Sequence, residues 1–328
     1  MYHTKEKTLQ AKFISLIKEK IPGQQVNTLM EILPLTKEAV YRRLRGDVPF
    51  SFVEMATLSA YLGISLDYVA ETISIYRSQW YKLHIRNYDE FEPIDLNMSH
   101  NFVKAINIAA DDPDSEFGIA ANILPLHISL LHFPVYRIYL LKWKYQFGKT
   151  PKSELKYSDI LVPEAEKETY CLYLNAIKKI KYTYFIWDGS FLLSLINDIN
   201  YFHSIRIINR EEMHMLKQEI NRLLDTLESY ADNGKFERTG NKIETYVSSL
   251  NFETTYSYLI SNNMFIGMGS AFCLGAFTTL DKEACQDMKK WIQGLKKSST
   301  LISGAAQRDK ILFFEKQRNV LDENFIIK

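Results

Sequence analysis

Residues 26–70 read VNTLMEILPLTKEAVYRRLRGDVPFSFVEMATLSAYLGISLDYVA, and this stretch decides how the N-terminal part of the 328-residue chain folds. Leu29, Ile32 and Leu33 recur at i, i+3 and i+4, which gives a short helix one apolar face. Pro34 ends that helix, because it disfavours helical backbone at the preceding residue and supplies no amide donor. The sequence therefore predicts a short helix that stops abruptly before the next one.

A second short helix is predicted from Lys37 to Arg45. Thr36 is a good N-cap, and Gly46 suits the left-handed position that closes a helix. The inner face is expected to bury Ala39, Val40 and Leu44. The other faces carry mostly charged side chains: Lys37, Glu38, Tyr41, Arg42, Arg43 and Arg45.

A third helix opens with a capping box, in which Ser51 is the cap and Glu54 stands three positions on. Phe50 and Met55 are spaced for the hydrophobic staple that accompanies such a box. Gly63 ends this helix. An amphipathic helix over residues 4–20 and a last short helix capped by Ser65 complete a predicted five-helix unit.

This layout resembles the DNA-binding domain of Xre/Cro-like repressors, over about residues 8–70. The residues that carry the resemblance are Leu29, Leu33, Leu35, Thr36, Ala39, Val40, Arg42, Gly46, Pro49, Leu58 and the run from Leu62 to Leu66. Two positions depart from the family pattern: Pro34 stands where the turn usually has glycine, and Leu44 replaces an acidic residue. Because proline cannot take a positive φ, the turn must be built differently.

The resemblance implies that the start of the 37–45 helix enters the DNA major groove. It assigns base-edge contacts to Lys37, Glu38, Tyr41 and Arg42. Among these, Arg42 is expected to hydrogen-bond guanine. It assigns phosphate contacts to Gln24, Gln25, Thr36, Arg43 and Arg45.

Positive charge is concentrated on the helix that is predicted to contact DNA. The whole chain has a net charge of +1, which by itself gives no argument for nucleic acid. Residues 36–46 hold four Lys/Arg against one Glu, a net charge of +3 in a short span. The alternative for such a run is an ordinary solvated helix face.

The cysteines and the N-terminus indicate a reducing cytoplasm. The three cysteines, an odd number without metal-like spacing, are Cys171, Cys273 and Cys285. Charged residues between Lys5 and Lys12 interrupt any signal-peptide pattern. The uncharged stretch from Phe117 to Tyr136 is long enough to span a membrane, but it contains Pro125 and Pro134 and is predicted to form two core helices.

The predicted fold is mainly α, with a small α+β part at the C-terminus. The predicted divisions are a five-helix head over 1–70, a linking helix over 71–92, a helical body over 93–235 and an α+β part over 236–328. Alternation over 243–249 and a candidate hairpin turn over 261–263 predict a three- to four-stranded antiparallel sheet in that last part.

No pattern predicts catalysis, a metal or a cofactor. His127 and His132 do not share a helix face, and Glu211 with His214 lacks the second copy that a di-iron site needs. The run 267–270 lacks the lysine of a phosphate-binding loop, and Asp188 reads as part of a helix cap. A further set of aromatic residues could form core or line a ligand pocket: Trp143, Tyr145, Tyr182, Tyr184, Phe185 and Trp187.

These observations predict a cytoplasmic, sequence-specific DNA-binding regulator of transcription that is not an enzyme. Its partners would be double-stranded DNA, a second copy of the chain and a small-molecule or protein effector, and none of its segments would cross a membrane. Two alternatives stay open. The head could be an antitoxin-like protein-interaction module that does not bind DNA, or the body could be an enzyme that the head targets to DNA.

Overall fold

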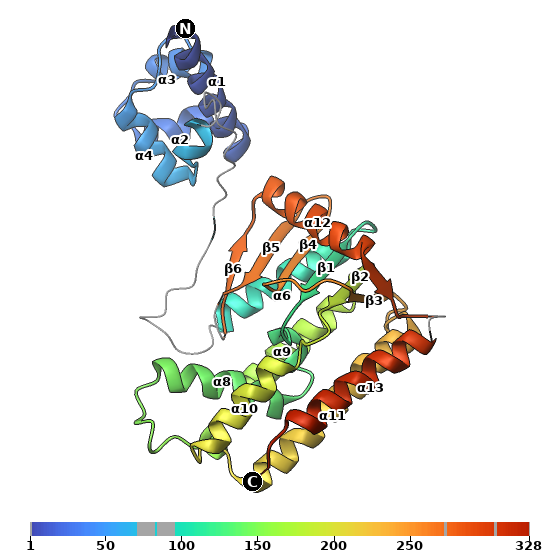
Figure 1. Cartoon of the computed structure of the whole chain (residues 1–328). Helices are drawn as coiled ribbons and strands as arrows, with labels where there is room; N and C mark the ends of the chain where they lie inside the picture. The colour runs from blue at the N-terminus through green and yellow to red at the C-terminus, as the bar shows by residue number, and fades with distance from the viewer. Residues whose placement is uncertain (1, 71–82, 84–95, 272–273, 305–306, 328) are drawn as a thin grey trace. The chain divides into compact units, whose positions relative to one another are not determined.

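The computed structural model describes residues 2–70, 83, 96–271, 274–304 and 307–327 (Figure 1). They fall into two compact units, Met1–Lys82 and Leu83–Lys328, called the head and the body below and described separately. The linking helix predicted over 71–92 lies outside the described residues, apart from Leu83, and so does Cys273.

The head consists of short helices whose ends follow local chemistry. They are α1 (Tyr2–Lys20), α2 (Gln25–Ile32), α3 (Lys37–Arg45), α4 (Phe52–Leu62) and α5 (Leu66–Ala70). The Thr36 hydroxyl accepts the Ala39 amide at 3.3 Å, and Gly46 closes α3 at a φ of 80°. Both hydrogen bonds of the capping box between Ser51 and Glu54 form. The predicted caps are therefore confirmed.

The turn before α3 is built around Pro34 without any positive φ. Leu33 is extended, with φ −115° and ψ 142°. The Leu35 amide donates to the Leu33 carbonyl oxygen at 2.7 Å, a bond that closes a tight three-residue turn around the proline. The extended Leu33 and this short hydrogen bond thus make the turn without the left-handed residue that a glycine would supply.

A small apolar core holds the head together. Phe13, Leu29 and Val40 are fully buried in it, and the rings of Phe13 and Phe50 meet edge to face at 5.7 Å. The Gln10 side chain both donates to the Phe50 carbonyl and accepts the Phe50 amide, each at 3.0 Å. This amide bracket ties α1 to the segment between α3 and α4.

The body is built on one seven-stranded mixed sheet in the order β6-β5-β4-β1-β2-β3-β7 (Figure 1). The strands are β1 (Glu116–Ala121), β2 (Tyr182–Trp187), β3 (Lys242–Ser248), β4 (Tyr256–Ile260), β5 (Phe265–Ser270), β6 (Ala276–Thr279) and β7 (Ser299–Leu301). β1, β2 and β3 run parallel, whereas the other neighbouring pairs are antiparallel.

The predicted fold class, mainly α with a small three- to four-stranded antiparallel sheet, is wrong. The chain is mixed α/β, and strands from both 93–235 and 236–328 enter one sheet. β1 lies within the stretch predicted to be helical, and β3 pairs with β2 in parallel instead of joining the hairpin. Strands buried on both faces read as continuous apolar runs, which periodicity alone does not separate from helix. The predicted hairpin of β4 and β5 is confirmed.

Helices cover both faces of this sheet. They are α6 (Leu96–Ala110), α7 (Leu126–Ser129), α8 (Phe133–Phe147), the 3-10 helix η2 (Tyr157–Asp159), α9 (Glu164–Ile177), α10 (Leu193–Ser204), α11 (Arg210–Asn233), α12 (Lys282–Lys297) and α13 (Gln307–Asn324). On one face Trp187 packs against Phe191 at 4.4 Å, and Phe191 stacks on Phe313 of α13. On the other face Tyr184 and Tyr258 form a second core with Ile292 of α12.

Within the described ranges, none of the helices has the length and apolar content that a bilayer crossing requires.

Candidate nucleic-acid interface

The predicted base-contacting residues lie together on the solvent side of α3. Lys37, Glu38, Tyr41 and Arg42 are all exposed, whereas Val40 on the opposite side is fully buried. The helix therefore packs on its apolar face and leaves its polar face outside. This arrangement follows from the 3.6-residue period, which separates Val40 from the charged positions.

Three of the four predicted base-contacting side chains take no part in the ion pairs and side-chain hydrogen bonds of the described residues. Among the residues that the structure describes, no ion pair or side-chain hydrogen bond engages Lys37, Tyr41 or Arg42. An exposed guanidinium without an internal partner offers a planar fork of donors to a ligand. Arg42 could therefore present two parallel donors to a base edge or a phosphate.

Arg43 has a different environment from the other phosphate candidates. Its Nη2 lies 2.8 Å from Glu54 Oε1 and its Nε donates to Glu54 Oε2 at 3.1 Å, a bidentate pair that joins α3 to α4. Burial raises the pKa of Glu54, but hydrogen bonds from the Arg43 side chain and the Ser51 amide outweigh it and lower the pKa. In this structure Arg43 braces the two helices.

Of the other residues predicted to contact DNA phosphates, some are exposed and some already make contacts within the protein. Arg45 pairs with Asp47 at 2.8 Å, but its side chain is 61% exposed, so the pair is weak and open to exchange. Gln24 is exposed just before α2, and Gln25 is half-buried in its first turn. Thr36 uses its hydroxyl as the helix cap.

An open groove of about 820 Å³ lies beside α3, between α1 and the segment that follows α3. Lys7 and Lys18 of α1 line it together with Arg45. The sequence analysis did not single out these lysines. Their separation of eleven residues, about three helical turns, places them on one face of α1 and could have indicated a shared surface.

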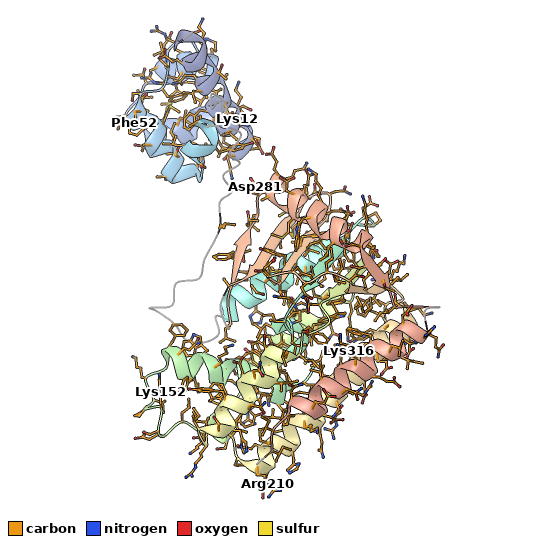
Figure 2. All side chains as sticks on the ribbon, viewed as in Figure 1. Lys12, Phe52, Lys152, Arg210, Asp281 and Lys316 are labelled. Carbon is orange, nitrogen blue, oxygen red and sulfur yellow. The ribbon has the colours of Figure 1, made fainter. Side chains whose placement is uncertain are left out.

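The outer face of α4 is apolar, which the sequence analysis also missed. Phe52, Val53 and Tyr61 are 77%, 72% and 68% exposed, and Figure 2 shows Phe52 at the surface of the head. The Thr57 hydroxyl donates to the Val53 carbonyl at 2.8 Å, so it does not offer its proton to solvent. An exposed apolar face of this kind is typical of a protein contact surface.

The six body aromatic residues do not line one pocket. Tyr182 and Tyr184 lie on the α12 face of the sheet, whereas Phe185 and Trp187 belong to the core on the opposite face. Trp143 and Tyr145 stand on α8.

The body residues considered for metal binding or catalysis lie in separate environments. The Nδ1 atom of His132 lies 3.1 Å from Glu219, whereas His127 sits among Phe117, Tyr173 and Phe185. The Asp188 carboxylate accepts the Ser190 amide at 2.8 Å, as a turn before a helix requires. Over the described ranges, no three His, Cys, Asp or Glu residues gather closely enough to hold a metal ion.

Comparisons of the chain with protein-family models, curated proteins and solved structures found no match. The residues and geometry described above therefore carry the functional proposal alone.

Proposed function

We propose that this chain is a sequence-specific DNA-binding regulator of transcription that acts in the cytoplasm as a homodimer. One observation carries the proposal: α3 presents Lys37, Tyr41 and Arg42 to solvent without an internal partner in the described residues. The helix also holds a net charge of +3. A short helix with a positive outer face has the dimensions and charge that a major groove accepts.

Each side chain of α3 has a distinct part in this proposal. Arg42 donates two hydrogen bonds to the O6 and N7 atoms of a guanine, and its neighbours Lys37, Glu38 and Tyr41 reach adjacent bases. Arg45 contacts phosphate by exchanging Asp47 for a phosphate oxygen. Arg43 acts indirectly, because its pair with Glu54 fixes α3 on α4.

The remaining phosphate contacts come from the flanking elements. Gln24 and Gln25 contact phosphate from the start of α2, and the backbone amides at the Thr36 cap add to them. Lys7 and Lys18 add positive charge from the groove beside α1, which Glu6 and Asp47 also line.

The rest of the chain would supply assembly and control. A head of this size reads too few bases for a genomic address, so two heads are expected on half-sites with centres about 34 Å, or a multiple of it, apart. The body would hold the dimer and respond to a small-molecule or protein effector. Such an effector changes DNA affinity only if it binds the DNA-competent and incompetent arrangements differently. The proposal includes no catalytic activity.

Selection of binding sites from random duplexes with the full chain tests the proposal directly. Enrichment of a two-fold symmetric sequence and a steep fall of affinity with salt are expected, because Lys and Arg displace condensed counterions. Recovery of no enriched sequence, together with a flat salt dependence, would contradict it.

A second function, a protein-interaction module without DNA contact, is favoured by the apolar outer face of α4. The pair of substitutions Phe52→Ser and Val53→Ser removes that face without touching α3. The DNA-binding proposal expects specific DNA affinity to survive this double change and to fall in Arg42→Ala. The interaction module would be supported if a cellular reporter lost its response in the double variant and kept it in Arg42→Ala.

A further inference from the structure

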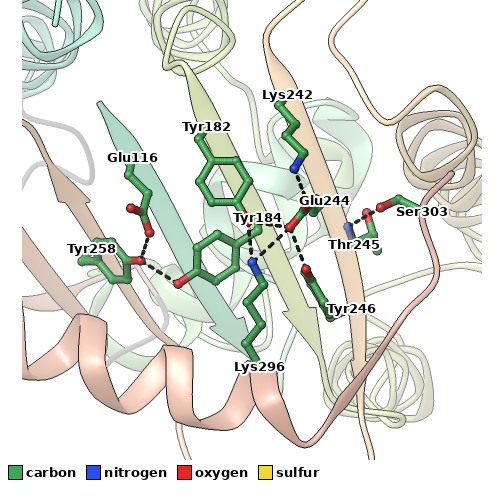
Figure 3. Close-up of polar contacts among 10 residues, drawn as sticks. All are labelled: Glu116, Tyr182, Tyr184, Lys242, Glu244, Thr245, Tyr246, Tyr258, Lys296 and Ser303. Atoms are coloured by element: carbon green, nitrogen blue, oxygen red, sulfur yellow. Dashed lines mark hydrogen bonds and ion pairs between the residues drawn. The ribbon is translucent and has the colours of Figure 1, made fainter. Parts of the chain in front are cut away.

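The sheet face beneath α12 holds a lysine inside a cage of tyrosine rings (Figure 3). The Lys296 ammonium lies 5.1, 4.5 and 4.7 Å from the ring centroids of Tyr182, Tyr184 and Tyr246. It also lies 3.0 Å from a carboxylate oxygen of Glu244. These three rings and this carboxylate are called the tyrosine cage below. All three centroid distances are within about 6 Å, the range of cation–π attraction, but the ammonium meets Tyr182 at its hydroxyl, to which it donates a hydrogen bond.

The strand register brings the cage together. β2 and β3 run parallel with Tyr184 opposite Glu244, and alternate residues of a strand point to the same face. Tyr182 and Tyr184 of β2 therefore stand beside Glu244 and Tyr246 of β3. Lys296 reaches them from the last turn of α12.

The cage holds its carboxylate ionised. The hydroxyls of Tyr182 and Tyr246 donate to Glu244 Oε2 at 2.5 and 2.6 Å, and Lys242 Nζ lies 2.6 Å from Oε1. Burial raises the pKa of Glu244, but these hydrogen bonds and that from Lys296 outweigh it and bring the pKa to about 2. Lys242 and the hydroxyls of Tyr182 and Tyr246 would still contact the carboxylate if Lys296 left the cage.

The polar contacts of the cage specify an ammonium group that carries protons. The Lys296 ammonium donates to the Tyr182 hydroxyl oxygen as well as to Glu244. A quaternary ammonium could contact the rings, but it could not make these hydrogen bonds. The Lys296 side chain is 24% exposed, so the cage is not sealed from solvent.

Lys289, seven residues earlier on the same helix face, provides an internal comparison. Its ammonium pairs with Glu116, and the ring of Tyr258 lies 5.8 Å away. The pair with Glu116 shows that α12 can be held to the sheet by a lysine and a carboxylate with one ring beside them. The additional rings around Lys296 give that position the chemistry of an amine-recognition site.

We propose that the tyrosine cage is a binding site for a primary alkylammonium ligand and that Lys296 is its internal occupant. An incoming ligand takes the place of Lys296 beside Glu244. α12 ends at Lys297, and β7 then pairs with β3 through Leu301 opposite Tyr246, so displacement of Lys296 acts on the junction of α12 and β7. The site goes beyond the proposed DNA interface, and its test needs no DNA.

The test is calorimetric titration of the full-length Lys296→Ala variant with n-butylammonium, which has as many carbons as a complete lysine side chain, one more than the change to alanine removes. Saturable binding is expected, at least tenfold tighter than to the wild-type chain, where Lys296 competes. The ligand should also raise the melting temperature of the variant. Tetramethylammonium at equal ionic strength should do neither, because it carries the charge without N–H donors.

Two matched variants make the outcome decisive. Lys296→Met fills the cage with an uncharged chain and should not bind n-butylammonium, and Lys289→Ala removes the neighbouring lysine and should not gain affinity over the wild type. Absence of saturable binding to Lys296→Ala would overturn the proposal, as would equal binding by Lys289→Ala.

A second readout covers the case in which Lys296→Ala does not fold. Trp291 of α12 lies 5.0 Å from the ring of Tyr256 and reports on the seating of the helix. Because the chain has four tryptophans, the signal is the difference in fluorescence between the wild type and Trp291→Phe. This difference should change saturably with n-butylammonium and stay constant with tetramethylammonium. A constant signal with both ions would overturn the proposal.

Discussion

Two helices of this molecule carry the same net charge and use it differently. α3 holds four Lys/Arg against one acidic residue and α12 holds five against two, so each has a net charge of +3. On α3, Lys37 and Arg42 face solvent, with no partner in the described part of the chain. On α12, Lys289 and Lys296 turn toward carboxylates on the sheet.

The difference arises from the surface on which each helix rests. Over the head residues that the structure describes, the core under α3 is apolar and offers no carboxylate to Lys37 and Arg42, whereas Arg43 pairs with Glu54 of α4. The sheet under α12 carries Glu116 and Glu244, so two of the five lysines of α12, Lys289 and Lys296, connect the helix to the sheet. The surface beneath a basic helix therefore decides whether its cations pair within the fold or stay exposed. Substitutions on α3 and on α12 should accordingly change different measurements.

The largest effect is expected from Glu244→Ala. The change leaves the Lys296 ammonium and the hydroxyls of Tyr182 and Tyr246 without their shared acceptor. Loss of one partner from a largely buried ion pair should lower the free energy of unfolding by about 3 kcal/mol, measured by urea denaturation. Glu253→Ala, an exposed position nearby in sequence, is the control and should change it little.

Acid should remove the same stabilisation. The pKa of Glu244 is lowered from 4.5 to about 2 in the folded protein, so its ionised form contributes stability above pH 4.5. That contribution is lost as the pH falls from 4.5 toward 2. The difference in unfolding free energy between the wild type and Glu244→Ala should therefore shrink over this range. A constant difference would show that the charge of Glu244 is not what stabilises the α12 face.

Gly118→Ala should have the next largest effect. A Cβ at Gly118 would lie 2.7 Å from ring atoms of both Tyr184 and Tyr258, whose hydroxyls are hydrogen-bonded at 2.6 Å. Because the rings must shift, overpacking should lower the free energy of unfolding by about 2 kcal/mol. Urea denaturation measures this loss, and specific DNA affinity of the folded fraction should stay unchanged. A loss of DNA affinity would contradict the view that packing on the α12 face of the sheet and DNA binding by α3 are independent.

Gly118 also shows why β1 could not be predicted from its own residues. The strand reads EFGIAA, and glycine and alanine are poor strand formers. The reason for the glycine lies on β2 and β4, whose tyrosine rings fill the space that a side chain would take. By contrast, the bounds of α3 were predicted because Thr36, Gly46 and the helix itself are adjacent in sequence.

The candidate sites differ in the same way. The residues of α3 could be named because a single helix carries them, and its apolar face indicated which side was outward. The tyrosine cage joins β2, β3 and α12, which lie far apart along the chain. From sequence, Lys296 only resembles a basic residue favoured near a helix C-terminus, and no local signal connects it to Glu244.

Arg42→Ala should produce a smaller change, and in binding instead of stability. Loss of a bidentate base contact should weaken specific DNA binding by about 1–2 kcal/mol and relax the preference at one base position. The exposed side chain makes no contact that the fold requires, so urea denaturation should be unaffected. Fluorescence anisotropy with specific and scrambled duplexes measures the effect. Arg45→Ala is the matched control and should weaken both duplexes alike, reducing the salt slope by about one unit.

The smallest expected change, Gly294→Ala, has the opposite sign to Gly118→Ala. Gly294 lies within α12, where an added Cβ would meet open space. Because alanine loses less backbone entropy than glycine in a helix interior, the free energy of unfolding should rise by about 0.5–1 kcal/mol. The two variants make the same chemical change, one against tyrosine rings and one against solvent. If Gly294→Ala were also destabilising, the open space around Gly294 would be contradicted, and the exposed side of α12 would have to be reconsidered as a contact surface.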